Sequence, residues 1–201
     1  MIQVDDFIDT FSAFFPGLQG LHPWDITQNL PSIILELISS LDAGYKVDNG
    51  LAIHSTAVIE KGSILKPPLI IGENCFIGAH AYLRGGVFLK NHVKIGTGCE
   101  IKSSIVFTHS SIAHFNFIGD SLIGSHVNFE AGSITANHFN ERTDKKISVF
   151  YRNKLIRTGS EKFGSLVGDR SKIGANAVLS PGTILEQDSI VKRLQLIDQQ
   201  E

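Results

Sequence analysis

Large aliphatic residues recur at every sixth position through most of this 201-residue chain. The series runs unbroken from Ile53 to Ile101 and resumes from Val167 to Val191. A second position, four residues after each aliphatic, holds mostly small or β-branched side chains from Ala57 to Ile105. Neither a helix nor a hairpin sheet has a period of six, whereas a β-solenoid does. We therefore expect the aliphatic side chains to point into one column, with the second position filling the core beside them.

Residues 1–50 lack this period and contain two helical patterns instead. The first is a set of aromatic residues at helical spacing: Phe7, Phe11, Phe14 and Phe15. The second pattern predicts a helix over residues 29–44, with Pro31 in its first turn and Gly44 at its end. Because each coil of a solenoid covers only its neighbours, the column needs caps at its ends. We expect an N-terminal helical cap, residues 1–50, on a β-helix domain, residues 51–201.

The repeat is interrupted at residues 139–162. Two apolar runs, 147–151 and 154–156, flank Arg152 and Asn153, which predicts a hairpin insertion that projects from the column. The insertion is rich in lysine and arginine. This charge fits either a solvated loop or a site for a phosphorylated ligand.

Composition narrows the classes of function. The chain has 18 basic and 20 acidic residues, which argues against nucleic acid as the main partner. No apolar run is long enough to span a membrane, and the first residues do not resemble a signal peptide. Cys75 and Cys99 occupy the small position of the repeat, so we expect core packing in a reducing, cytoplasmic environment rather than a disulfide or metal site. Walker, HExxH and paired CxxC motifs are absent, as is a dinucleotide-binding opening.

Several motifs between residues 53 and 191 resemble a known transferase family. These motifs are AYLRGG, CEIKSS, IAHFNFIGD, VNFEAGSITAN and FGSLVGDRSKIGANAVLSPGTIL. They are similar to the acetyltransferase domain of the bifunctional glucosamine-1-phosphate acetyltransferase/UDP-N-acetylglucosamine pyrophosphorylases. The hairpin segment is closer to the archaeal sugar-1-phosphate nucleotidylyltransferases with the same C-terminal domain. The resemblance implies an all-β fold, a left-handed parallel β-helix of hexapeptide repeats, with the hand opposite to the usual crossover rule.

The resemblance also implies a reaction. Acetyl-CoA would acetylate the amine of an amino-sugar 1-phosphate, glucosamine 1-phosphate first, on the route to UDP-N-acetylglucosamine. His114 would be the general base, since an imidazole can take a proton from the ammonium group near neutral pH. A backbone N–H at a glycine-rich turn is a suitable donor to the thioester oxyanion. The family works as a homotrimer, with its grooves between subunits.

Spacing and resemblance together give the candidate binding residues. Arg84 and Lys102 are 18 residues apart, which is one full coil, so both should lie at the same edge and could clamp a phosphate. The resemblance assigns substrate binding to Arg84, Lys102, Phe117, Asn128 and Lys146. It assigns the acetyl-CoA groove to Ala131, Asn137, His138 and Ala175. Lys192 or Arg193 is a candidate for the 3′-phosphate of CoA.

The chain departs from the family at several of these positions. Phe117 and His138 replace tyrosines, Thr143 replaces a loop lysine, and Glu130 replaces a glycine. These changes leave the acceptor open and allow an alternative in which the protein binds sugar nucleotide or acetyl-CoA without turnover.

A further alternative is a zinc enzyme like the γ-carbonic anhydrases, which share the fold. His109 and His114 have the spacing of two zinc ligands. The position expected for the third ligand offers Glu73 instead, and His80 is too close in sequence. We therefore predict no bound metal.

Overall fold

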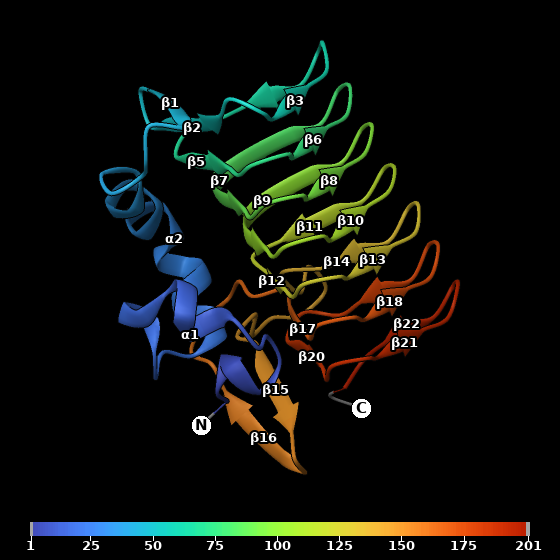
Figure 1. Ribbon diagram of the computed structural model, residues 1–201. Coiled ribbons are helices and arrows are strands. Elements are labelled where there is room, and N and C mark those ends of the chain that lie inside the picture. The colour runs from blue at the N-terminus through green and yellow to red at the C-terminus, as the bar shows by residue number, and fades with distance from the viewer. Residues whose placement is uncertain (1, 200–201) are drawn as a thin grey trace.

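The computed structural model describes residues 2–199 and forms a column of stacked three-sided coils with helices along one flank (Figure 1). Each coil adds a short strand to each face, and neighbouring coils pair in parallel. The first face contains β2 (Leu51–His54), β5 (Leu69–Ile71), the second halves of β7 (Tyr82–Leu89) and β9 (Glu100–Val106), β12 (Leu122–Ile123), β17 (Ser165–Val167) and β20 (Thr183–Leu185).

The other two faces have the same construction. The second face contains β3 (Val58–Ile59), β6 (Phe76–Ile77), β8 (Lys94–Ile95), β10 (Ser111–Ile112), β13 (Asn128–Phe129), β18 (Lys172–Ile173) and β21 (Ile190–Val191). The third face contains β4 (Ile64–Leu65), the first halves of β7 and β9, β11 (Phe117–Gly119), β14 (Ile134–Thr135), β19 (Val178–Leu179) and β22 (Leu196–Ile197). The fold class is therefore a parallel β-helix, as the repeat predicts.

The predicted aliphatic column forms the core. The series from Ile71 to Ile101 is fully buried, and so is most of the series after the interruption. The inward residues of the first coil, such as Ile53 and Ile59, are partly buried against the same cluster. Cys75 and Cys99 are buried free thiols in this core, and burial raises the pKa of Cys75 to about 11. The prediction that both cysteines are core residues is confirmed.

The repeat shortens by one residue after Ile101, and this corrects one expected core position. Leu89 pairs with Val106, 17 residues on, whereas Ile71 pairs with Leu89, 18 residues on. The register shifts because β7 carries Gly85 and Gly86 where β9 has a single serine. Val106 therefore points into the column, and Ile105 points outward into a second apolar cluster.

This second cluster covers the outer surface of the first face. Outward side chains of the face, including Phe88, Ile105 and Leu122, pack against Phe11, Trp24 and other residues of the N-terminal segment. The segment contains α1 (Phe11–Phe14), α2 (Pro23–Ile38) and two short 3-10 turns (Val4–Asp6 and Pro16–Leu18). The helix α2 contacts β5, β7 and β9, so it runs along the flank (Figure 1). The prediction that these helices cap an end of the column is wrong, because they pack on the apolar outer surface of the first face instead.

The boundaries of α2 also differ from the prediction. The helix begins at Pro23, which occupies the first-turn position that the sequence assigned to Pro31. Pro31 lies inside the helix, where it removes one internal N–H donor. The helix starts earlier because Trp24, Ile26 and Leu30 extend its buried stripe. It ends at Ile38, before the predicted Gly44.

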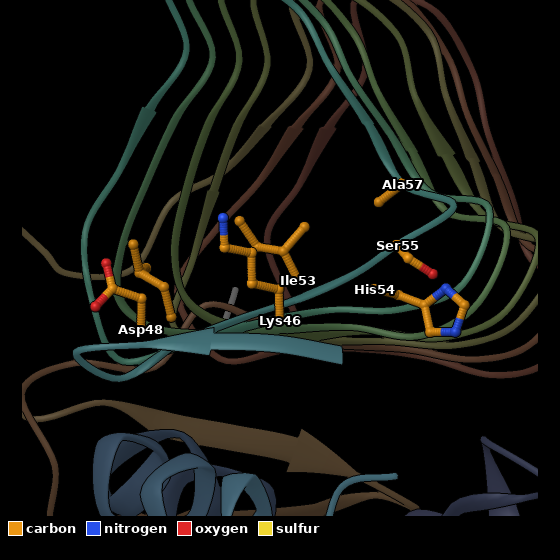
Figure 2. A pocket seen from close by; sticks show the side chains of 7 residues that line it. Lys46, Asp48, Ile53, His54, Ser55 and Ala57 are labelled. Carbon is orange, nitrogen blue, oxygen red and sulfur yellow. The ribbon is translucent and has the colours of Figure 1, made fainter. Parts of the chain in front are cut away.

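The N-terminal end of the column is covered in part by a strand. β1 (Tyr45–Asp48) pairs antiparallel with β2, so that Lys46 lies opposite Ile53 and Asp48 lies opposite Leu51. Figure 2 shows Lys46, Asp48 and Ile53 around a pocket of about 390 Å³ at this end. Charged side chains from β1 thus lie over the apolar first coil, and such inward-facing charges oppose edge-to-edge pairing.

The insertion forms the predicted hairpin. β15 (Ser148–Tyr151) pairs antiparallel with β16 (Lys154–Arg157), and Arg152 and Asn153 both have positive φ, as a two-residue hairpin turn requires. The hairpin does not project freely, because Ile147 and Val149 are fully buried in the second apolar cluster. The insertion therefore packs both on the N-terminal segment and on the outer surface of the C-terminal coils.

Candidate active site

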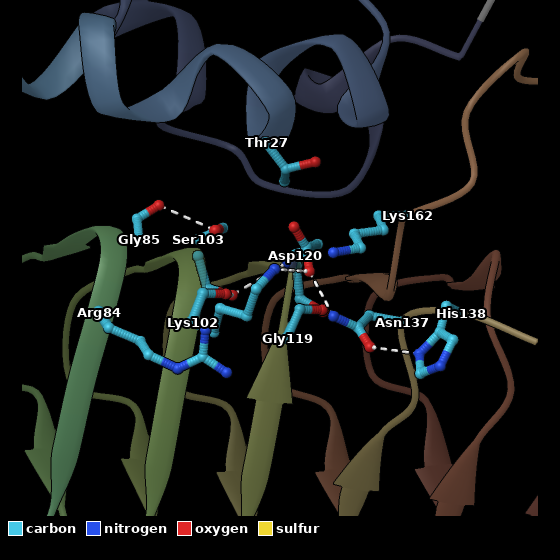
Figure 3. Close-up of polar contacts among 12 residues, drawn as sticks. Thr27, Arg84, Gly85, Lys102, Ser103, Gly119, Asp120, Asn137, His138 and Lys162 are labelled. Atoms are coloured by element: carbon cyan, nitrogen blue, oxygen red, sulfur yellow. Dashed lines mark hydrogen bonds and ion pairs between the residues drawn. The ribbon is translucent and has the colours of Figure 1, made fainter. Parts of the chain in front are cut away.

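Five of the predicted site residues line one pocket on the third face. The pocket has a volume of about 300 Å³ and is lined by Arg84, Lys102, Phe117, Asn137, His138 and Lys162. Figure 3 shows the polar side chains of this group, which are those of Arg84, Lys102, Asn137, His138 and Lys162. The period brings Arg84 and Lys102 together. Phe117 follows on the next coil, paired with Glu100, whereas Lys162 comes from the end of the insertion.

Arg84 and Lys102 lie side by side, as their spacing of one coil predicts. They are paired residues on β7 and β9. Arg84 donates from Nε and Nη2 to Glu100 Oε1 at 2.7 and 2.6 Å, and its guanidinium lies 5.6 Å from the centre of the Tyr82 ring. Its remaining N–H groups are available to a ligand, because a guanidinium carries five donors.

Lys102 is held by a buried carboxylate that the sequence reasoning missed. Its Nζ donates to Asp120 Oδ2 at 2.6 Å, with side-chain exposures of 14% and 7%. Asn137 Nδ2 donates to the same oxygen, and Asn137 Oδ1 lies 3.4 Å from His138 Nδ1 (Figure 3). The chain of contacts fixes the orientation of Lys102 and Asn137. It also neutralises most of the lysine's charge, so Lys102 is a weaker anion clamp than its spacing suggests. The motif IAHFNFIGD, which ends at Asp120, was the available signal for this residue.

His114 lies elsewhere, at the corner that joins the second face to the third. We call this the second corner and define it by equivalent positions on successive coils: Ala79, Thr97, His114, Ala131, Ala175 and Arg193. Backbone bonds connect these coils, for example Gly132 N to His114 O at 2.9 Å and Asn176 N to Ala131 O at 3.0 Å. The predicted base and the two predicted groove alanines therefore form one line along the column. The side chain of His114 is exposed.

Glu130 fills the end of this line. Its Oε2 accepts from Ala175 N at 2.8 Å and from Arg193 Nε at 2.7 Å, while Oε1 accepts from Arg193 Nη2 at 2.6 Å. The Arg193 guanidinium and the Ala175 N–H lower the pKa of Glu130. The added charge that the sequence indicates is thus paired within the chain. The Glu130 carboxylate therefore engages the backbone N–H of Ala175, a residue of the predicted acetyl-CoA groove. It also engages Arg193, a candidate for binding the 3′-phosphate of CoA.

Two predicted substrate residues lie apart from the third-face pocket. Asn128 is exposed on the second face and lines a separate pocket of about 260 Å³ together with Glu130, Lys172 and Arg193. Lys146 is exposed in the insertion and lines none of the pockets described here. Within one chain, the candidate residues other than Lys146 therefore divide between the third face and the second corner with its adjoining second face.

The geometry does not support the zinc alternative. His109 lies at the opposite corner, between the first and second faces, where its ring stacks on His92 at 4.6 Å and on His126 at 5.0 Å. It is therefore separated from His114 by a face of the column. Over residues 2–199, no group of three histidine, cysteine or acidic side chains is placed to hold a metal ion.

Fold and site together define a class of protein: a hexapeptide-repeat β-helix with a cationic pocket on one face and a histidine at the adjoining corner. Residues 68–102 and 166–192 match the family model for the hexapeptide repeat of succinyl-transferase. None of the helices within residues 2–199 has the length and apolarity that a membrane crossing requires.

Curated relatives extend this similarity over most of the chain. The chain is 32% identical over 184 residues to the Bifunctional protein GlmU of Methanococcus maripaludis, covering 88% of this chain and 43% of that protein. It is 33% identical over 166 residues to the bifunctional sugar-1-phosphate nucleotidylyltransferase/acetyltransferase of Sulfurisphaera tokodaii, covering 80% and 41% respectively. A hexapeptide transferase family protein from Anaplasma phagocytophilum aligns with a TM-score of 0.46 at 20% identity, covering 73% of this chain and 72% of that chain. The predicted resemblance is confirmed, and the chain spans about two fifths of the length of these curated relatives.

Proposed function

We propose that this protein is an acetyl-CoA-dependent N-acetyltransferase whose acceptor is an amino-sugar 1-phosphate, with glucosamine 1-phosphate as the first candidate. The observation that carries the proposal is the third-face pocket. It gathers Arg84, Lys102, Asn137 and His138, the residues to which the sequence resemblance assigns substrate or acetyl-CoA binding. Arginine and lysine together suit a phosphate, and the asparagine suits a sugar hydroxyl.

In the proposed reaction His114 takes a proton from the acceptor ammonium. The free amine attacks the thioester carbon, the C–S bond breaks, and CoA leaves as a thiolate. The second proton lost by the attacking nitrogen protonates the thiolate, and the first passes from His114 to solvent, so one proton is released per turnover. The exposed imidazole of His114 has a ring nitrogen that can accept the ammonium proton. Ala131 and Ala175 follow His114 along the second corner, where small side chains let the pantetheine arm of CoA approach the backbone.

We propose that the site is completed between chains, because Arg84 and Lys102 lie at the ends of their third-face strand segments whereas His114 lies at the corner before those strands begin. A homotrimer would place the third face of one subunit against the second corner of the next. An apolar ladder on the outside of the third face supports this arrangement, since Phe117 pairs with Ile134, Ile134 with Val178, and Val178 with Leu196. Ile134 and Leu196 are 37% and 63% exposed in the single chain.

The test is release of CoA thiol from acetyl-CoA with glucosamine 1-phosphate as acceptor. We expect steady turnover by the wild type and a loss of about 100-fold or more in kcat for His114→Ala, the range of general-base catalysis. The matched control is His80→Ala, an exposed histidine at the same corner two coils earlier, which should retain wild-type turnover. Absence of release by the folded wild type with every amino-sugar phosphate tried would contradict the proposal.

A second candidate function is ligand binding without turnover, and Glu130 is the observation that favours it. Its carboxylate holds the Ala175 N–H and Arg193 that acetyl-CoA would use. Under this alternative, wild-type protein binds a sugar nucleotide or acetyl-CoA in calorimetry but releases no CoA.

A further inference from the structure

One position of the repeat, the first residue after each strand of the second face, differs in chemistry between coils. Gly78, Gly96 and Gly174 occupy it in three coils, and Glu60 and Glu130 occupy it in two others. The positions are equivalent because each backbone N–H donates to the carbonyl of the inward aliphatic on the next coil, as Glu130 N does to Ile173 O at 2.9 Å. A glutamate at this position therefore adds a carboxylate where the repeat otherwise presents bare backbone.

The two glutamates share one contact and differ in a second. Glu60 Oε2 accepts from Ala79 N at 2.7 Å, and Glu130 Oε2 accepts from Ala175 N at 2.8 Å, so each bonds to the backbone of the next coil. Glu130 also holds the Arg193 guanidinium with both of its oxygens. Two parallel contacts of this kind fix the orientation of a guanidinium and offset its charge. The Glu130–Arg193 pair is therefore more than the backbone contact that Glu60 makes.

The pair lies at one end of the second corner. His114, Ala131, Ala175 and Arg193 follow one another on successive coils, and three steps of about 4.8 Å separate the first from the last by about 14 Å. A pantetheine arm that starts with its thioester at His114 and follows the corner would bring the nucleotide end of CoA to Arg193. Side-chain exposures of 73% for Arg193 and 35% for Glu130 leave the pair accessible to such a ligand.

We propose that Glu130 determines the donor specificity of the protein: by holding Arg193, it prevents recognition of the 3′-phosphate of CoA, so that acetyl-CoA and its 3′-dephospho form are bound equally well. This inference rests on the proposed function for the identity of the donor. A free arginine binds a phosphate monoester with several parallel N–H groups. Here an incoming phosphate would first have to break the existing bidentate pair, so the phosphate adds little net affinity. The rest of the donor then determines its binding.

The test is calorimetry with CoA and with 3′-dephospho-CoA, which measures binding without turnover. Wild type should bind the two within about twofold of each other. Glu130→Gly frees the Ala175 N–H, which can serve both ligands, and Arg193, which can serve only the phosphate. The variant should therefore bind CoA about tenfold more tightly than 3′-dephospho-CoA. In the double variant Glu130→Gly with Arg193→Met the preference should return to within about twofold, while any gain common to both ligands remains.

The matched control is Glu60→Gly, which removes the same backbone contact at the other end of the column and should leave both affinities at their wild-type values. Two results would overturn the inference. One is a wild type that already prefers CoA about tenfold, because another cation, such as Lys172 of the adjoining pocket, would then bind the phosphate. The other is a folded Glu130→Gly variant that gains no preference.

Binding also separates this inference from the proposed function. The expected affinities in a wild type that transfers no acetyl group would support the role of Glu130 and refute the acetyltransferase. Failure of both wild type and Glu130→Gly to bind CoA would refute both.

Discussion

At the scale of single residues, three histidines at the corner between the first and second faces form a stack across neighbouring coils. His92, His109 and His126 have φ of 62°, 60° and 58°, and their rings stack at 4.6 and 5.0 Å. Desolvation lowers the pKa of His109, and the charges that His92 and His126 would carry lower it further. The folded protein therefore favours the neutral imidazole at the centre of the stack.

This shift predicts acid sensitivity. Because the folded-state pKa lies below the unfolded value, the stabilisation is complete above the unfolded pKa of about 6.5 and is lost as the pH falls from there through the lower folded-state pKa. Thermal melting between about pH 7.5 and pH 5 should show a falling Tm for wild type and a shallower fall for His109→Asn. Asparagine suits the site, since Asn74 has φ of 53° at the same corner. His80→Asn, at the second corner, should keep the wild-type slope. A His109→Asn slope equal to wild type would show that the stack does not control stability.

At the scale of elements, the docking of α2 depends on a glycine of β7. Gly86 has φ of 88°, and a Cβ atom there would lie 3.0 Å from the nitrogen of Pro31. The bulge that contains Gly86 thus makes room for the middle of the helix. The backbone of α2 at Pro31 can approach β7 closely because Gly86 has no side chain.

Gly86→Ala should therefore destabilise the protein by about 1–3 kcal/mol, from the left-handed backbone and the overpacked contact together. Urea unfolding at fixed protein concentration measures the change. The control is Gly17→Ala, where the added methyl group would meet nothing within 4 Å and φ is not positive. It should stay within about 0.5 kcal/mol of wild type. Equal midpoints for the two variants would mean that α2 adjusts without cost.

The repeat reveals most of this architecture in advance because every coil repeats the same inward position. A one-residue deletion is harder to recognise. Ile105 and Val106 are adjacent β-branched aliphatics, so either fits the core, and the glycine pair of β7 decides which one enters. The start of α2 was ambiguous for a similar reason, since Pro23 and Pro31 both suit a first turn. The flank position of the helices could not follow from the period, which describes inward residues and not outward ones.

The candidate site also contains some residues that the sequence predicts and others that it does not. The Arg84–Lys102 contact is predictable because 18 residues make one coil there. Lys162 was missed as a pocket residue because the insertion breaks the period, so its distance along the chain carries no register. Asp120 was missed because its role depends on burial at a corner, where it accepts from both Lys102 and Asn137. Repeats predict neighbours on adjacent coils, whereas insertions need the folded structure.

At the scale of the whole molecule, the three faces differ in what covers them. Helices and the insertion cover the first face. The second face exposes the polar side chains of Lys94, Asn128 and Lys172 along its middle, and the apolar side chains of Val58 and Ile190 at its two ends. The third face leaves its apolar ladder open beside the candidate pocket. An uncovered apolar stripe next to a candidate site is a combination expected of a subunit interface.

The proposed homotrimer predicts a mass of about 66 kDa in solution for three chains of 22.0 kDa. Ile134→Lys places a charge in the middle of the ladder and should shift the protein toward monomer, because a buried unpaired charge is costly. The control is Leu155→Lys, which replaces a 61% exposed leucine on the hairpin and should remain trimeric. Light scattering after gel filtration measures both. Turnover should fall with the trimer in Ile134→Lys, although His114 and Lys162 are unchanged, because the two halves of the site would no longer meet. A wild-type monomer that still turned over would place the whole site on one chain and exclude this arrangement.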